Sequence, residues 1–435
     1  MLIFMMNLHV ISASSEKANS EISTETDRKS RADELLELRL EKAQDSSPTA
    51  QDKIEQLFLR VERGNQDRTL TVRVGDFYPK FGGPRAGSGF GGGLRYYNSN
   101  IQDSAVSFEG AGIFSLNGYR LMDLRFGSYN KTDPVFFSGP SDFGVPFDFA
   151  KERPGVKQTR TVLFGDFIYR YFPRERFWGL GPDTDAEART NYLQEDFSFA
   201  LIGGYEFTSW LAATAGGGLY KVDIREGTDE RYPSTQEIFD DSTAPGLTRQ
   251  PDFYRLLSAI YFNYQDNPGN PHKGGIVGIF FSRYTERNGK EFTFNRLELD
   301  ARNYIPLGSR QRTLAIRFYT SSSFVGEGGR VPFYLSPTLG GGRILRGFHD
   351  FRFRDTNLAY LSTEYRWEPA PAFELALFYD LGTVFPEGYR FEREDLIGTF
   401  GGGVRFKTSN RVVLRFDVGK SVEGTRFQFS FGPSF

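Results

Sequence analysis

Residues 296–302 read Arg-Leu-Glu-Leu-Asp-Ala-Arg, an unbroken alternation of charged and apolar side chains. Successive side chains of a β-strand point to opposite faces, so this pattern predicts a strand with one apolar and one charged face. A charged row of this density does not suit the core of a water-soluble β-sandwich. It suits a transmembrane β-barrel, in which the apolar face meets lipid and the polar face lines the lumen.

The same pattern recurs along most of the chain. In residues 411–419, for example, Phe416 and Val418 fall on the face opposite to Arg415 and Asp417. Clusters of Gly, Pro, Asn and Asp separate one alternating segment from the next, as turns separate strands. Sixteen strands are predicted, at 69–77, 89–98, 103–114, 118–129, 159–172, 194–207, 210–222, 253–266, 273–284, 292–304, 312–324, 357–367, 372–384, 397–407, 411–419 and 425–435.

The even number of strands lets both ends of the barrel sequence lie on the periplasmic side. The connection at 325–356 then lies outside the cell or folds back into the lumen, and a connection of this length is usually functional. The predicted fold class is therefore all-β: a transmembrane antiparallel β-barrel of about 16 strands. It has a short N-terminal helical segment and a long loop, between strands 11 and 12, folded into the lumen.

The composition fits this class and excludes others. The chain has 44 Phe, 22 Tyr and 48 Gly, which suits many strands with aromatic girdles and tight bends. No stretch approaches the roughly 20 apolar residues of a membrane-spanning helix, although alternating strands would not need one. The formal net charge of -2 provides no basic surface for nucleic acid, so no nucleic-acid partner is expected.

Residues suited to catalysis or metal binding are scarce. Cys is absent, and the three His residues, His9, His272 and His349, lie far apart in the sequence. No Gly-x-Ser-x-Gly motif is present to position a nucleophilic serine. We therefore expect no enzymatic activity, no cofactor and no metal site.

The N-terminal part has a different character from the barrel sequence. Residues 1–13 contain an apolar run followed by small residues, which resembles an export signal; the alternative is a disordered tail. Residues 14–67 are charged, leucine-containing and almost free of aromatics, which predicts a periplasmic helical linker. The barrel itself is expected over 68–435.

The long connection contains the most informative motif. Residues 339–348 read Leu-Gly-Gly-Gly-Arg-Ile-Leu-Arg-Gly-Phe, and they end in Arg346, Gly347 and Phe348. This resembles the Gly-Gly and Val/Leu-Arg-Gly-Phe/Tyr motif of the bacterial surface antigen superfamily, which contains the BamA and TamA outer-membrane assembly factors. In that family the loop folds into the barrel and its arginine docks on a carboxylate of the inner wall.

The resemblance supplies a partner for this arginine. The family's second motif is an aromatic residue, then Asp, one residue and Gly, and it matches Tyr379-Asp380-Leu381-Gly382 here. The alternation also turns Asp380 and Glu364 inward, so Glu364 is a second candidate. A guanidinium inside a barrel needs a carboxylate to offset its desolvation, and the bidentate pair fixes a loop in one orientation. On spacing alone, Arg346 could instead be a solvated loop residue and Asp380 a turn former.

Two further segments extend the resemblance over roughly residues 260–435. Residues 266–274, Asp-Asn-Pro-Gly-Asn-Pro-His-Lys-Gly, match the family's Asp, Asn-Pro, Gly turn and precede the long connection by three strands. The last predicted strand contains Phe431 and ends on Phe435, similar to the C-terminal aromatic signal that the outer-membrane assembly machinery reads. Phe435 is also expected to belong to an aromatic girdle.

The chain also departs from the family's pattern. BamA and TamA carry polypeptide-transport-associated domains before the barrel, and residues 14–67 are too few to hold one, so a short member lacking these domains is expected. The resemblance implies a protein of the outer membrane of a diderm bacterium. It would assist insertion or translocation of protein, or of lipid, through a weak seam between the first and last strands.

The expected partners are outer-membrane lipid, the assembly machinery that inserts this chain, and client outer-membrane proteins. A passive channel or a structural surface antigen without clients is the alternative. An outer-membrane phospholipase is disfavoured, because no His lies in a securely predicted strand.

Overall fold

The structure is a computed structural model of the 435-residue chain. It describes residues 76–98, 106–129, 160–388, 395–407 and 412–435, apart from residues 86, 268 and 433. The chain divides into two units, Met1–Leu57 and Phe58–Phe435, and all described residues belong to the second. The predicted signal peptide at 1–13 and helical linker at 14–67 lie outside the described residues.

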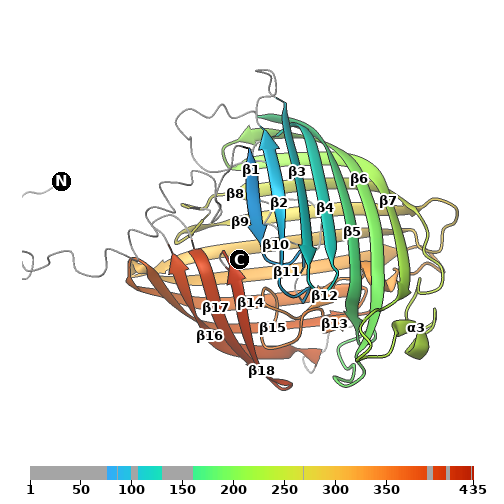
Figure 1. Ribbon diagram of the computed structural model, residues 1–435. Coiled ribbons are helices and arrows are strands. Elements are labelled where there is room, and N and C mark those ends of the chain that lie inside the picture. Colours follow the sequence, from blue (N-terminus) through green and yellow to red (C-terminus); the bar gives the residue numbers. More distant parts are fainter. Residues whose placement is uncertain are drawn as a thin grey trace, which may run out of the picture. The chain divides into compact units, whose positions relative to one another are not determined.

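Sixteen strands form one antiparallel sheet, in which each strand pairs with the next along the chain (Figure 1). This confirms the predicted all-β barrel architecture and its strand number. The strands are β1 (Phe77–Phe81), β2 (Gly91–Asn98), β3 (Ser107–Ser115), β4 (Arg120–Ser128), β5 (Thr161–Phe177), β6 (Thr190–Thr208), β7 (Leu211–Glu226), β8 (Phe253–Asn263), β9 (Gly274–Glu286), β10 (Phe294–Leu307), β11 (Ser309–Val325), β14 (Asn357–Ala370), β15 (Phe373–Phe385), β16 (Ile397–Lys407), β17 (Val412–Ser421) and β18 (Gly424–Phe431).

Two corrections concern the two ends of the sheet. The first strand, predicted at 69–77, is Phe77–Phe81, and it contains Pro79, which counts against a strand when the sequence is read alone. An edge strand tolerates proline, because one side of its backbone has no ladder to support. The last strand, predicted to reach residue 435, ends at Phe431, and Gly432 follows with a positive φ of 81° that turns the chain.

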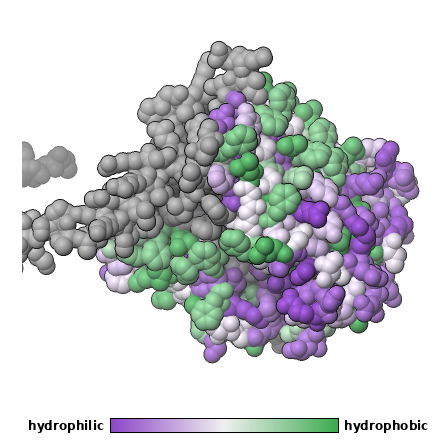
Figure 2. All heavy atoms as spheres, viewed as in Figure 1, coloured by the Kyte–Doolittle hydropathy of each residue, from purple (hydrophilic) through white to green (hydrophobic). Residues whose placement is uncertain are grey.

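Alternation along each strand separates apolar from charged side chains. On β15, Leu377 and Tyr379 are 66% and 50% exposed, whereas Glu374 and Asp380 are 1% and 0% exposed. Charges are buried and large apolar side chains are exposed, the reverse of a water-soluble protein. Figure 2 shows hydrophobic residues gathered over the strands and hydrophilic residues around the helical turn α3 (Thr235–Ile238). The exposed apolar face is the surface that lipid would cover.

The long connection between β11 and β14, the eleventh and twelfth strands of the sheet, has structure of its own. It contains the short 3-10 helix η3 (Phe333–Leu335) and two strands of two residues, β12 (Thr338–Leu339) and β13 (Phe353–Arg354), which pair with each other. Its tip contacts inward-facing residues of β14, β15 and β17, so the connection folds into the lumen as predicted. None of the helices in the described part of the chain is long and apolar enough to cross a membrane.

Candidate functional site: an arginine lock in the lumen

The register of β14 to β17 assembles a polar surface on the inner wall. Ser362 on β14 pairs with Asp380 on β15, and Asp380 pairs with Thr399 on β16. The next inward row runs from Glu364 through Phe378 to two glycines on β16 and β17. Because neighbouring strands lie about 4.8 Å apart, these rows place Asp380 and Glu364 within reach of one guanidinium.

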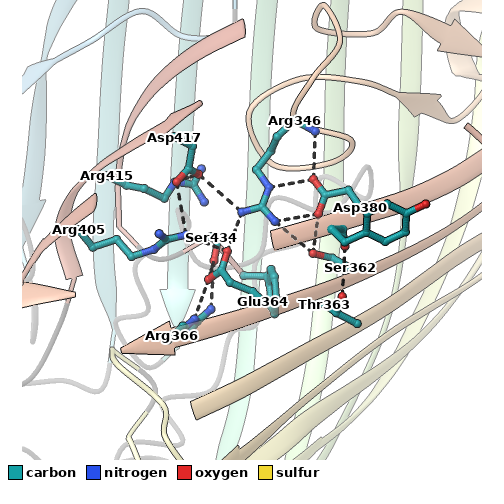
Figure 3. Close-up of polar contacts among 12 residues, drawn as sticks. Arg346, Ser362, Thr363, Glu364, Arg366, Asp380, Arg405, Arg415, Asp417 and Ser434 are labelled. Atoms are coloured by element: carbon teal, nitrogen blue, oxygen red, sulfur yellow. Dashed lines mark hydrogen bonds and ion pairs between the residues drawn. The ribbon is translucent and has the colours of Figure 1, made fainter. Parts of the chain in front are cut away.

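The loop delivers Arg346 between these two carboxylates (Figure 3). Its Nε and Nη2 donate to the two oxygens of Asp380 at 2.8 and 2.7 Å, and its backbone N–H donates to Asp380 at 3.1 Å. Its Nη1 donates to Glu364 at 2.6 Å, and Ser362 contributes a longer contact at 3.3 Å. The Arg346 guanidinium also lies 3.4 Å from the ring centroid of Phe378. Asp380, Glu364 and Ser362 together accept four hydrogen bonds from the guanidinium.

Glu364 is shared by several groups besides Arg346. Arg366 Nε donates to Glu364 at 2.7 Å, Arg405 Nη2 donates at 2.8 Å, and the Ser434 hydroxyl donates at 2.8 Å (Figure 3). A carboxylate with two oxygens can accept about four hydrogen bonds, so all the acceptor positions of Glu364 are occupied. The lock is thus one part of a network that reaches from the loop to the last residues of the chain.

The charges of this network balance only when Arg346 is present. Without Arg346, the wall has three guanidiniums, Arg366, Arg405 and Arg415, and four carboxylates, Glu364, Glu374, Asp380 and Asp417. Arg346 adds the fourth positive charge and also lies 3.6 Å from Asp417. An unpaired charge in a region this buried is costly, so the wall itself attracts a cation at this position.

Burial and pairing act in opposite directions on the Arg346 pKa. Burial would lower it, but the carboxylates of Asp380 and Glu364 raise it well above the ordinary value for arginine. Arg346 therefore stays charged at any pH at which the protein is folded. Loss of the proton from Arg346 is therefore not a way in which the lock opens.

The backbone of the loop tip is strained and closely packed. Leu345 and Phe351, on either side of the tip, adopt positive φ angles of 59° and 61°, which are uncommon for residues with a side chain. Such conformations persist only where surrounding contacts over-determine them. Leu345 and Phe348 are fully buried in an apolar cluster with Phe353 and residues of β11, β14 and β15. Apolar packing and the charge network therefore hold the tip together.

Glycines leave the space that the tip occupies. A Cβ on Gly347 would lie 2.8 Å from Thr399 Oγ1 and 3.0 Å from the backbone of Lys420. On the facing strand, a Cβ on Gly419 would lie 2.8 Å from the backbone oxygen of Arg346. Gly382 has a similar role, because a Cβ there would lie 2.9 Å from the backbone oxygen of Ala359. These positions need glycine for close approach rather than for a special φ.

The sequence-predicted residues and the observed site overlap substantially. The structure brings Arg346, Asp380 and Glu364 together and buries Gly347 and Phe348 beside them. Sequence reading did not identify several other members, namely Ser362, Arg366, Arg405, Gly419 and Ser434. Arg366 lies two residues after Glu364 on the same face of β14, a signal that alternation could have offered, but nothing in the sequence showed that Arg366 and Arg405 would both meet Glu364.

The C-terminal aromatics and the predicted turn are placed as follows. The Phe431 backbone pairs with Leu414 at the end of β18. Phe435 is 7% exposed, and its ring stacks on that of Tyr304 with the ring centroids 6.4 Å apart. Phe435 therefore turns inward, and the expectation that it belongs to a lipid-facing aromatic girdle is wrong. In the turn at 266–274, Asp266 Oδ1 accepts backbone hydrogen bonds from His272 and Lys273, and the His272 side chain contacts Glu368.

The fold and this site together define an outer-membrane β-barrel with a loop locked inside its lumen. A family model described as the Omp85 superfamily domain matches residues 125–435, most of the described barrel. The chain therefore belongs to the Omp85 superfamily.

Several solved structures are similar to this chain in fold. BamA from Haemophilus ducreyi lacking POTRA domains 1-3 matches with a TM-score of 0.56 and 16% identity, covering 81% of this chain and 68% of that one. CdiB from Acinetobacter baumannii gives a TM-score of 0.46 and 11% identity, covering 82% of this chain and 59% of that one. CdiB from Escherichia coli gives a TM-score of 0.48 and 12% identity, covering 84% of this chain and 63% of that one.

At 16% identity, the likeness to BamA concerns the fold. The chain spans less than two thirds of each CdiB chain that it matches. No curated protein matches the sequence.

Proposed function

We propose that this barrel assists the insertion of proteins into the outer membrane, or their translocation across it, and that it does so without enzymatic chemistry. The observation that carries the proposal is the buried Arg346 lock, which fixes a loop inside the lumen on two carboxylates. Membership of the Omp85 superfamily supports the same class of role.

The interior of the barrel favours this proposal over a passive channel. A passive channel needs a continuous path of water, as in large porins. Here the loop tip, an apolar cluster and four buried arginines occupy the space beside β14 to β17. A barrel whose lumen holds a structured loop is better suited to a conformational change that handles a client protein than to passive diffusion of solutes.

The edges of the sheet also favour the proposal. β1 has five residues and β18 has eight, and among the described residues neither pairs with any strand besides its one neighbour. Strand edges without a second partner expose backbone groups that can pair with another chain. Such a seam would provide the site for a client strand.

Depletion of this chain in its bacterium tests the proposal. We expect the membrane levels of other outer-membrane barrel proteins, or of translocated proteins, to fall. Wild type and the matched control Arg249→Ala should restore them, because Arg249 pairs with Glu286 at the end of β9 and with Glu291 in the β9–β10 connection, away from the lock. Arg346→Ala and the milder Asp380→Asn should restore them poorly, with barrel folding checked by mobility on unheated gels.

Unchanged client levels after depletion, together with a steady salt-dependent conductance of the purified barrel in planar bilayers, would favour the channel instead. The partners that go with the proposal are outer-membrane lipid, client proteins and the machinery that inserts this chain, for which Phe431 and Phe435 remain the predicted signal.

A further inference from the structure

The last hairpin, β17–β18, lies at the free edge of the sheet, yet it makes many contacts with groups in the lumen. Among the described residues, the ladder found for β18 is the one with β17. An edge of this kind in a membrane is costly unless other contacts hold it. The structure provides such contacts at both ends of the hairpin.

At the extracellular end, the contacts come from the loop between β11 and β14. Arg352 is 2% exposed, and its Nε donates to Glu423 in the β17–β18 turn at 2.7 Å. Its Nη1 donates to the Thr184 hydroxyl in the β5–β6 connection at 2.7 Å. Arg352 thereby joins the last hairpin to a connection on another part of the barrel. We call these contacts the outer tether.

Two further contacts reinforce the outer tether. The Ser421 hydroxyl donates to the backbone oxygen of Gly347 at 2.9 Å, directly beside Arg346. Arg426 on β18 contacts the His349 ring nitrogen Nε2. Because Gly347 and His349 belong to the loop tip, the hairpin and the lock share one segment of chain.

At the periplasmic end, the chain turns inward after β18 and docks on the inner wall. The Ser434 hydroxyl donates to Glu364 at 2.8 Å and accepts from Arg366 Nη2 at 3.0 Å. The Tyr304 hydroxyl donates to the backbone oxygen of Phe435 at 2.9 Å, and the two rings stack. These contacts form the inner tether, and Glu364 is the carboxylate that also holds Arg346.

From this geometry we infer that the outer and inner tethers hold β18 in place, so that the position of the loop controls the freedom of the strand edge. Displacement of the loop would remove Arg352, Gly347 and His349 from the hairpin together. It would also leave Glu364 without one of its cations. The device couples the lock to the seam through side chains rather than through a ladder with β1.

Hydrogen exchange measured by mass spectrometry on the purified barrel tests this coupling. We expect Arg352→Ala to accelerate exchange of the amides in 422–431 by about tenfold or more, the effect of losing a charge-assisted hydrogen bond at a local opening. The pair Ser434→Ala and Tyr304→Phe should accelerate the same amides from the other end. Amides of β6 and β7 should keep their wild-type rates in both variants.

Arg249→Ala is the matched control, because Arg249 is also a loop arginine that bridges two carboxylates, Glu286 and Glu291, but not in the last hairpin. It should leave 422–431 unchanged. If Arg352→Ala does not fold, Glu423→Gln removes the same charge pair from a side chain that is 15% exposed.

Wild-type exchange of 422–431 in the outer-tether variant and in the inner-tether variant would overturn the inference, as would equal acceleration in the Arg249→Ala control. The measurement needs no client protein. The inference can therefore fail while the proposed function stands, and the reverse.

Discussion

Two regions of the inner wall face the same lumen and fill it by opposite means. The wall of β14 to β17 carries the charge network around Arg346. The wall of β5 to β8 has two buried carboxylates of its own, Asp166 and Asp196, but it also contains an extended apolar cluster. The cluster consists of Val162, Phe164, Ala200, Ile202, Ala212, Leu257, Ala259 and Tyr261. Apolar packing is not directional, whereas a bidentate guanidinium accepts one orientation. The charged wall therefore specifies where the loop sits, and the apolar wall contributes stability.

The largest effect is expected from a substitution in the charged wall. Arg346→Ala leaves two buried carboxylates without their shared cation, a cost of about 3 to 5 kcal/mol in unfolding free energy for a well-desolvated pair. We expect the 326–356 connection to become cleavable by protease added from outside the cell. Limited proteolysis followed by mass spectrometry measures this directly.

Asp380→Ala should give a similar but smaller effect, because Glu364 still accepts from Arg346. The double variant should be no worse than Arg346→Ala alone, because the two residues are coupled and their effects do not add. Wild-type digestion patterns in both single variants would contradict the lock.

An intermediate effect is expected on the apolar wall. Leu257→Ala removes a side chain that is 6% exposed from the cluster on β5 to β8, at a cost of about 2 to 4 kcal/mol. The temperature of unfolding should fall, as read from the mobility shift on gels. The digestion pattern of the connection should not change, and release of the loop by this variant would show that the two walls are not independent.

A smaller effect should come from Gly347→Ala. The added Cβ would approach Thr399 Oγ1 to 2.8 Å and the backbone of Lys420 to 3.0 Å, so the tip must shift, at a cost of about 1 to 3 kcal/mol. Thr399→Ala in the same chain should recover part of this loss. The denaturant midpoints of the single and the double variant measure the recovery. If the midpoint does not recover, the clash with the backbone of Lys420 causes the loss of stability.

The smallest effect concerns pH and the outer face of the loop. Burial, followed by the charge of Arg426, lowers the pKa of His349 to about 4. The folded state thus binds fewer protons than the unfolded state between this value and the ordinary pKa of about 6.5. The stabilising contribution is complete above pH 6.5 and is lost as the pH falls toward 4.

Protease sensitivity of the connection should accordingly rise over that interval, and His349→Gln should flatten the dependence. A wild-type protein whose sensitivity is constant from pH 7 to pH 4 would contradict the assignment of this titration to His349.

Much of the charged wall could be predicted, and the reason is local. Alternation placed Arg415, Asp417 and Asp380 on the inner face before any contact was known, because side-chain direction in a strand depends only on position along it. The strand ends were harder to predict. β5 extends to Phe177 and β6 begins at Thr190, beyond the predicted 172 and 194, because their pairing continues past a bulge at Phe172 and Glu175.

The sequence by itself determined that this chain is a barrel of sixteen strands with a loop arginine and an inward carboxylate to receive it. The sequence offered Glu364 as a second candidate, and the tertiary structure decided that it joins Asp380 in holding Arg346. The tertiary structure alone decided that Ser434 and Phe435 turn inward. The physical reason is the distance along the chain over which each feature is determined. Alternation is set by each strand's own backbone, whereas contacts across the lumen depend on the register accumulated over many paired strands, which no single segment encodes.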